Sequence, residues 1–347
     1  MNIAGYTRFD ATSKKDLTDQ FDRVYNTLVD HGIPVIIGEY ALLAYDHNRP
    51  GIIERGEQRK YFEFLGNYAR ERRLTTMLWD AGQFLNRNTL QWRDAELFGQ
   101  IRSSWTNRSG TASSDLVFLP KSSPITGQTL TLDTNGTDFQ GVRHGSRNLA
   151  AGRDYTVSGN QLTLTATALN ELAGDRSYGV NATREARFSR GVPWRIDVIT
   201  YDPPVLSNTS GNTSGLTIPT RFRGDMLATM EATYDDGTNA GPASWTSYQQ
   251  WDTAFTAYTG DSIKLIAEFL DSLKDSSRAT LTFHFWSGAT ATYRHQVRQH
   301  GDRNERLIPH AVDQARRQSA STRLARSAPG RTAGHPNRTP PAKAARS

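Results

Sequence analysis

The run Ile33–Tyr40 limits what the N-terminal part of this chain can fold into. It consists of apolar, mostly β-branched residues, followed by Gly38 and the carboxylate of Glu39. Strands that are buried on both faces of a parallel sheet have continuous apolar runs of this kind. In parallel α/β barrels the chemistry lies at the carboxyl ends of the strands. The pattern therefore predicts a buried strand at 34–38, with Glu39 just beyond its end.

The residues around this run alternate between helical and extended patterns. Apolar side chains recur at helical spacing over three segments, 13–31, 57–72 and 94–105. Ser13 is the expected N-cap of the first helix. A second apolar run at 74–79 predicts another strand. Two strands with helices between them indicate a parallel sheet, but a (β/α)8 barrel needs eight strands and about 250 residues.

Beyond Gly110 the helical period disappears and short extended segments follow one another. Asp154–Val157 and Gln161–Leu164 flank a Ser-Gly-Asn turn, which is a hairpin signal. Short strands with turns between them predict an immunoglobulin-like sandwich over 112–203. A pattern of strand, apolar turn and strand at 161–183 returns at 262–286, and this repeat predicts a second β-sandwich over 216–300.

The net charge of +6 comes from the C-terminal segment. Residues 303–347 hold ten Lys/Arg and two Asp/Glu, whereas the rest of the chain holds 31 basic and 33 acidic side chains. The predicted folded part therefore has no basic footprint for a nucleic acid partner. Residues 302–347 have few large apolar side chains and are predicted to be disordered. A contact of this basic tail with nucleic acid or an anionic surface is the alternative.

Composition excludes several other classes of protein. No run approaches the roughly 20 apolar residues of a membrane span, and the N-terminus lacks the basic start and apolar core of a signal peptide. The absence of cysteine excludes disulfides and thiolate chemistry. The histidines are scattered and no Gly-rich phosphate motif occurs, so neither a metal nor a cofactor is expected. The folded chain is expected to be a monomer.

Two neighbouring strand ends together indicate a sugar site. Glu39 follows the first predicted strand, and Trp79 ends the second, beside polar loop residues. The C–H faces of a pyranose ring pack well on an indole, and a carboxylate can act on the anomeric carbon. A salt-bridged surface glutamate and a core tryptophan are the alternatives.

The segment Pro34–Tyr40 resembles the seventh-strand motif of glycoside hydrolase family 5, the endo-β-glucanase (cellulase) family. The resemblance implies that Glu39 is the catalytic nucleophile. Leu74–Gly82 looks like the eighth strand, whose Trp79 would line the subsite on the non-reducing side of the cleaved bond. Residues 1–108 would then be the C-terminal part of the (β/α)8 barrel, with its last two strands.

The downstream segments resemble modules that accompany such barrels. Residues 112–203, with Gly152–Val157, are similar to the immunoglobulin-like X2 module of bacterial cellulases, and residues 216–300, with Leu281–Gly288, to the family 46 carbohydrate-binding module. This order recurs in secreted bacterial family 5 enzymes that act on cellulose, mixed-linkage β-glucan and xyloglucan. The resemblance thus implies an extracellular protein, although this chain shows no signal peptide.

Tryptophans of the last module are the candidates for binding glucan. In a strand at 280–286, Trp286 would share the polar face with His284, so its indole is predicted to contact glucan. Trp251, flanked by polar residues, is a second candidate, and Trp245 a weaker one. Partial burial, or docking against the neighbouring domain, is the alternative for each.

The resemblance also shows what the sequence lacks. Family members retain configuration and use two carboxyl groups about 5–5.5 Å apart, one as nucleophile and one as general acid/base. The family's second glutamate lies in an Asn-Glu-Pro motif, which does not occur here. The histidine and tyrosine that precede the family's sixth helix are missing too. Asp46, Glu54 and Glu57 lack the rigid strand-end setting that a substitute would need.

The sequence therefore predicts the C-terminal portion of a retaining endo-β-1,4-glucanase that is inactive as this chain alone and whose partner is a β-glucan. A non-catalytic β-glucan-binding protein that uses only residues 115–300 is the alternative from another class. A gene fragment without a function of its own is the third.

Overall fold

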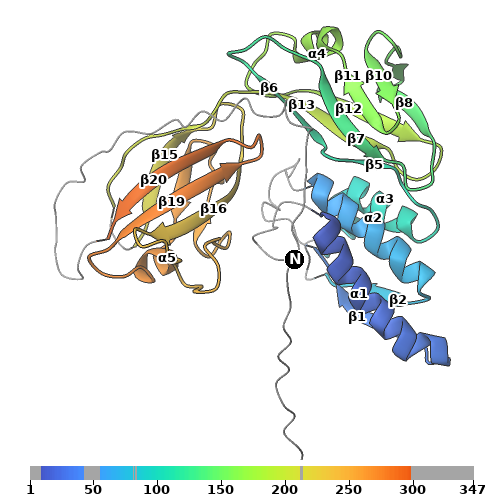
Figure 1. Ribbon diagram of the computed structural model, residues 1–347, viewed down its shortest axis with the longest axis horizontal. Coiled ribbons are helices and arrows are strands. Elements are labelled where there is room, and N and C mark those ends of the chain that lie inside the picture. Colours follow the sequence, from blue (N-terminus) through green and yellow to red (C-terminus); the bar gives the residue numbers. More distant parts are fainter. Residues whose placement is uncertain (1–8, 43–54, 81, 83, 212–213, 298–347) are drawn as a thin grey trace, which may run out of the picture. The chain divides into compact units, whose positions relative to one another are not determined.

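The computed structural model describes residues 9–42, 55–80, 82, 84–211 and 214–297 (Figure 1). The predicted disordered tail at 302–347 lies outside the described residues, as do Asp46 and Glu54. Over the described residues, a short α/β segment is followed by two modules made mostly of strands, as the sequence predicts. None of the helices in the described ranges is long and apolar enough to cross a membrane.

The first segment is a two-stranded parallel sheet with helices before, between and after its strands. β1 (Ile36–Tyr40) pairs with β2 (Thr75–Leu78) in parallel. The helical elements are α1 (Ala11–Thr27), a 3-10 turn (Val29–His31), α2 (Arg55–Glu71) and α3 (Ala95–Ser104). A short hairpin of β3 (Leu85–Asn86) and β4 (Gln91–Trp92), which the sequence pattern did not predict, lies between β2 and α3.

The first helix begins and ends earlier than the predicted span of 13–31: α1 covers Ala11–Thr27, and a 3-10 turn at Val29–His31 completes the span. Asp10 is its N-cap, because the Asp10 carboxylate accepts a hydrogen bond from the backbone N–H of Ser13 at 2.9 Å. Ser13, the predicted cap, therefore lies inside the first turn. Gly32 ends the 3-10 turn with a φ of 79°, a left-handed conformation that glycine adopts without strain.

β1 differs from the predicted strand in position and in burial. It covers Ile36–Tyr40, so Glu39 lies inside the strand and not after it. Ile36 is 62% exposed, and Tyr40 is the one buried residue of β1. The prediction of burial on both faces was wrong: Ile37 and Tyr40 join the apolar clusters formed with the helices, whereas Ile36 does not. The core of the segment lies between the sheet and α2 and α3, and contains Tyr40, Phe62, Leu65, Phe84, Leu97 and Ile101.

The middle module is a sandwich of two sheets with the orders β10-β11-β7-β5 and β6-β13-β12-β8-β9. Its elements are β5 (Thr111–Ala112), β6 (Leu116–Pro120), β7 (Gln128–Asp133), β8 (Phe139–His144), β9 (Arg147–Asn148), β10 (Tyr155–Ser158), β11 (Gln161–Leu164), α4 (Ala166–Ala173), β12 (Gly179–Phe188) and β13 (Trp194–Tyr201). The predicted hairpin is confirmed, since β10 and β11 pair through a turn at Gly159 and Asn160. Trp194 is fully buried in the core between the sheets.

The last module also has two sheets, with the orders β14-β15-β18-β17 and β16-β19-β20. Its elements are β14 (Val205–Leu206), β15 (Leu216–Arg221), β16 (Leu227–Tyr234), β17 (Phe255–Thr256), β18 (Ser262–Leu265), α5 (Ala267–Asp271), β19 (Arg278–Phe285) and β20 (Thr290–Gln296). The sequence repeat corresponds to a repeat of elements: β11, α4 and β12 in the middle module, and β18, α5 and β19 here.

Candidate active site

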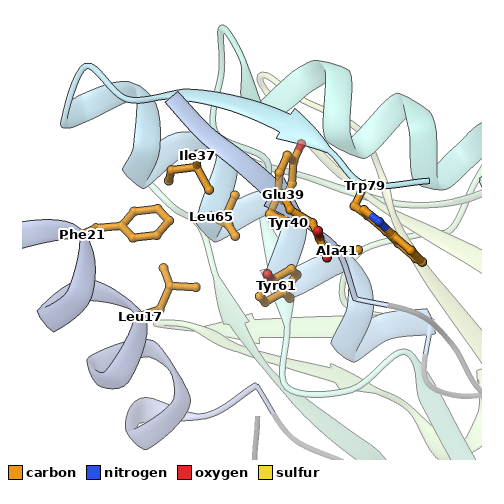
Figure 2. Close-up of a pocket in the computed structure, with 9 residues that line it drawn as sticks. All are labelled: Leu17, Phe21, Ile37, Glu39, Tyr40, Ala41, Tyr61, Leu65 and Trp79. Carbon is orange, nitrogen blue, oxygen red and sulfur yellow. The ribbon is translucent and has the colours of Figure 1, made fainter. Parts of the chain in front are cut away.

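An open pocket of about 520 Å³ lies beside the ends of β1 and β2 (Figure 2). Glu39 from β1 and Trp79, which directly follows β2, both line it. Helices α1 and α2 supply further side chains. The complete lining is Leu17, Phe21, Ile37, Glu39, Tyr40, Ala41, Tyr61, Leu65 and Trp79. The structure therefore brings together the two residues that the sequence predicted for a sugar site.

The backbone pairing of the two strands fixes both side chains. The register shifts between Ile37 and Tyr40, which places Gly38 and Glu39 in an irregularity of the ladder. Such bulges re-aim a side chain and are frequent next to active sites. Beyond the bulge, the backbone N–H of Trp79 donates to the carbonyl oxygen of Tyr40 at 2.9 Å. Trp79 is 38% exposed, so part of its indole can meet a ligand.

A glycine inside a strand often marks a place where another group approaches closely, but Gly38 does not. A Cβ atom built at this position would meet nothing within 4 Å. No neighbour in the described structure thus requires a glycine there for close approach.

Glu39 is the only carboxylate among the lining residues. Within the described ranges, no hydrogen bond or ion pair to it is found. Burial raises the pKa of Tyr61 to about 12, and the nearby Tyr40 adds to the rise. Burial also raises the pKa of Tyr40, although a hydrogen bond with Thr76 opposes it. Both phenols are therefore neutral near pH 7, and Glu39 is the group in this pocket that can attack an anomeric carbon.

No second carboxyl group joins Glu39 among the described residues. Glu57 is buried elsewhere: it accepts the backbone N–H of Phe9 at 2.6 Å and the ammonium of Lys60 at 2.7 Å. Its contacts are structural, in agreement with the expectation that it cannot replace the general acid/base. Retaining hydrolysis needs two carboxyl groups about 5–5.5 Å apart, and the lining of this pocket supplies one.

The loop after Trp79 has an anchor that sequence reasoning overlooked. The Asp80 carboxylate accepts backbone N–H groups of Gly82, Phe84 and Leu85 at 2.7, 3.0 and 3.1 Å. Burial acts to raise the pKa of Asp80, but the hydrogen bonds from these N–H groups outweigh it and hold the pKa below its usual value. Asp followed two residues later by Gly is a turn signal, so the anchor could have been predicted.

Trp286 does not lie on the polar face of β19, because that strand ends at Phe285. Its side chain is 8% exposed and packs with Ala228 in a cluster that Leu116 and Phe118 of the middle module border. This position agrees with the alternative of docking against a neighbouring domain. It is at odds with the predicted glucan contact, since the indole face is covered.

Trp251 belongs to the core of the last module. It is 8% exposed, and its indole N–H donates to the hydroxyl oxygen of Tyr258 at 3.0 Å. Its ring packs edge to face against Phe255. Burial therefore also disfavours glucan contact at Trp251. Trp245, the weakest of the three sequence candidates, is instead 71% exposed and is the tryptophan of this module that can stack on a sugar.

No group of three or more His, Asp or Glu side chains in the described ranges could hold a metal ion.

Three family models match consecutive stretches of the chain. The cellulase (glycosyl hydrolase family 5) model matches residues 2–85, the carbohydrate binding domain X2 model residues 111–198, and the CBM46 carbohydrate binding domain model residues 202–304. The resemblance drawn from Pro34–Tyr40 and from the downstream motifs is therefore confirmed.

Longer relatives match most of this chain. Endoglucanase B of Paenibacillus lautus is 45% identical over 294 residues, which are 84% of this chain and 52% of the relative. The tri-modular endo-β-1,4-glucanase B of Bacillus halodurans superposes with a TM-score of 0.79 at 43% identity, over 84% of this chain and 54% of that one. A trimodular GH5_4 subfamily endoglucanase superposes with a TM-score of 0.80 at 40% identity, over 85% of this chain and 56% of that one. The chain thus spans about half the length of the relatives that it matches.

Proposed function

We propose that this chain, which carries the C-terminal part of a family 5 glycosyl hydrolase module followed by X2 and CBM46 carbohydrate binding domains, is a portion of a retaining endo-β-1,4-glucanase. The observation that carries the proposal is the meeting of Glu39 and Trp79 at one pocket. The relatives named endoglucanase support the reaction class. Its substrate is a β-glucan, and because that polymer lies outside cells, the enzyme acts extracellularly.

The proposed mechanism is double displacement. Glu39 attacks the anomeric carbon, the bond to the leaving oxygen breaks, and a glycosyl-enzyme intermediate forms. A second carboxyl group gives its proton to the leaving oxygen and then takes one from the water that releases the sugar. Trp79 holds the sugar ring next to the cleaved bond. Since the pocket contains no second carboxylate among the described residues, the chain by itself should not complete this cycle.

The test is an activity assay on an aryl β-cellobioside. The chain alone should give no turnover above background. A fusion that places the N-terminal part of the Paenibacillus lautus endoglucanase B barrel before it should be active, and Glu39→Gln in that fusion should abolish turnover. Asp16→Asn, which alters an exposed carboxylate of α1, is the matched control and should leave activity unchanged. Activity of the chain alone, or of the Glu39→Gln fusion, would contradict the proposed roles.

The exposure of Trp245 favours a second function, glucan binding without chemistry. We propose that the last module binds β-glucan through this indole. Trp245→Ala should remove the retardation of the chain in gels that contain β-glucan or xyloglucan. Circular dichroism should confirm that both Trp245→Ala and Trp286→Ala are folded. Retardation that persists in Trp245→Ala but is lost in Trp286→Ala would show that Trp286, and not Trp245, binds the glucan.

A further inference from the structure

A groove of about 730 Å³ lies on the middle module, far in sequence from Glu39. Three pieces of backbone border it: the end of β8 with Arg143 and His144, the end of α4 with Glu171 and Leu172, and residues 181–185 of β12. β12 pairs with β13 from Gly179 onward, but with β8 only from Glu185 to Phe188. Residues 179–184 therefore have one edge without a strand partner among the described residues, and the groove lies against this edge.

Arg184 is the unusual residue of this groove. It is one of the residues that line the groove, although it is only 8% exposed. One guanidinium nitrogen, Nη1, donates to the carbonyl oxygen of Thr183 at 2.7 Å. The buried Nε has no hydrogen-bond partner, and no carboxylate in the described ranges forms an ion pair with the group. Burying a cation without a counter-charge is unfavourable, and an anion that joins it relieves this cost.

Two carboxylates are among the lining residues, those of Glu171 and Glu185, and neither forms an ion pair with Arg184 in the described structure. The Glu185 carboxylate accepts a hydrogen bond from Nε of Arg143 at 2.9 Å, so it is already paired. Burial lowers the pKa of the Arg184 guanidinium, and no nearby carboxylate reverses this effect. The groove therefore presents an arginine whose counter-charge is not supplied by the described part of the chain.

We propose that the groove binds an acidic sugar residue, a uronic acid, whose carboxylate pairs with Arg184. A guanidinium presents N–H groups in a planar fork that fits a carboxylate. The volume lies in the range of small-ligand sites, roughly 300–1,000 Å³. His144 and Glu171 line the groove and offer hydrogen-bonding groups to sugar hydroxyls. A saccharide is favoured because residues 111–198 match a carbohydrate binding domain. This site is separate from Glu39, and either proposal can fail alone.

The test compares two trisaccharides on the full chain, trigalacturonate and the neutral cellotriose. The acidic trimer should bind, and its amide chemical-shift changes in an NMR titration should cluster at residues 171–174 and 181–185. Cellotriose should leave these amides unchanged. Failure of trigalacturonate to bind, equal shifts with cellotriose, or shifts that map elsewhere would each overturn the proposal.

Variants then separate binding from structure. Arg184→Met keeps the side-chain volume and should weaken trigalacturonate binding about tenfold to a hundredfold, the effect of losing charge-assisted hydrogen bonds. Its Tm should equal or exceed that of the unaltered chain, because an unpaired buried charge is removed. Arg187→Met, on an exposed position of the same strand outside the groove, should change neither quantity. Unchanged affinity in Arg184→Met, or a lower Tm, would mark Arg184 as a structural residue and overturn its assigned role.

Discussion

The parallel sheet of the first segment and the sheets of the two sandwiches contain similar apolar residues but bury them differently. Ile36 of β1 and Met77 of β2 are mostly exposed, whereas Ile196 and Val198 of β13 are fully buried. The difference lies in the neighbours. β13 is covered by an opposing sheet and paired on both edges, while β1 has one partner strand in the described structure. An apolar strand sequence thus predicts that the strand is buried, but whether it is depends on the sheets and helices that cover it.

The two regions also differ in how they are held. Each sandwich has its own continuous core between two sheets. The first segment has a smaller core and adds polar contacts to the middle module. Arg108, which follows α3, donates through Nε to the carboxylate of Glu63 at 2.5 Å and through Nη2 to the side-chain oxygen of Asn135 in the middle module. Buried Arg59 of α2 donates to the carbonyl oxygen of Pro193 at 2.6 Å. The sandwiches should therefore fold without the first segment, whereas the first segment depends on its contacts with the middle module.

The largest effect is expected from a cavity in a closed core. Phe283 of β19 is fully buried, so Phe283→Ala should lower the free energy of unfolding of the last module by about 3–5 kcal/mol. Urea denaturation measures this change. Met77→Ala, at an exposed position of β2, is the matched control and should cost less than about 0.5 kcal/mol. Equal losses in the two variants would contradict the contrast between the regions.

A somewhat smaller effect is expected where the first segment meets the middle module. Arg108→Met leaves the buried carboxylate of Glu63 without its ion-pair partner and should cost about 3 kcal/mol. Limited proteolysis should then cut the first segment before the sandwiches. Arg108→Met combined with Glu63→Leu removes both charges and should recover part of the loss. If the single variant resists proteolysis as the unaltered chain does, this ion pair does not hold the segment.

Asp115 of the middle module lies against Gly56 of α2, and its titration should make stability depend on pH. Burial raises the pKa of Asp115 to about 7 from a usual value of 3.8; the charges of Asp197 and Glu57 add to the rise, whereas its own backbone N–H and Arg59 oppose it. Between about pH 4 and 7 the Asp115 carboxyl group is therefore protonated in the folded state and ionised in the unfolded state. The contribution of Asp115 to the free energy of unfolding falls as pH rises through this range. The urea midpoint, relative to that of Asp115→Asn, should be higher at pH 4.5 than at 7.5. A pH-independent difference would refute the shift.

The smallest change in the free energy of unfolding, together with a clear change in aggregation, is expected in the two-stranded sheet of β1 and β2. Ile36→Thr replaces an exposed apolar residue of β1 by another β-branched residue and should alter the free energy of unfolding by less than about 0.5 kcal/mol. Exposed apolar strands promote association, so the variant should show less aggregate by light scattering. Ile196→Thr, fully buried in β13, is the opposite control and should destabilise its module.

Local patterns in the sequence determined the elements of this protein and the pairing of its site residues. Helical spacing placed Phe62, Leu65 and Ala69 on the buried face of α2, and turn chemistry placed the β10–β11 hairpin. These signals act within a few residues, so the chain carries them without its tertiary fold. The two strand ends with Glu39 and Trp79 could be predicted together because parallel neighbours end at the same edge of a sheet.

Only the tertiary structure decided which side chains remain free to act. Trp286 is covered by groups distant in the chain, and Trp251 is buried in the core of its module, while Trp245 is exposed. Arg184 occupies a strand position that the sequence does not distinguish, and packing leaves it 8% exposed, with a buried Nε that has no hydrogen-bond partner in the described structure. Burial and charge pairing depend on which strands and modules meet, so periodicity along one strand cannot predict them.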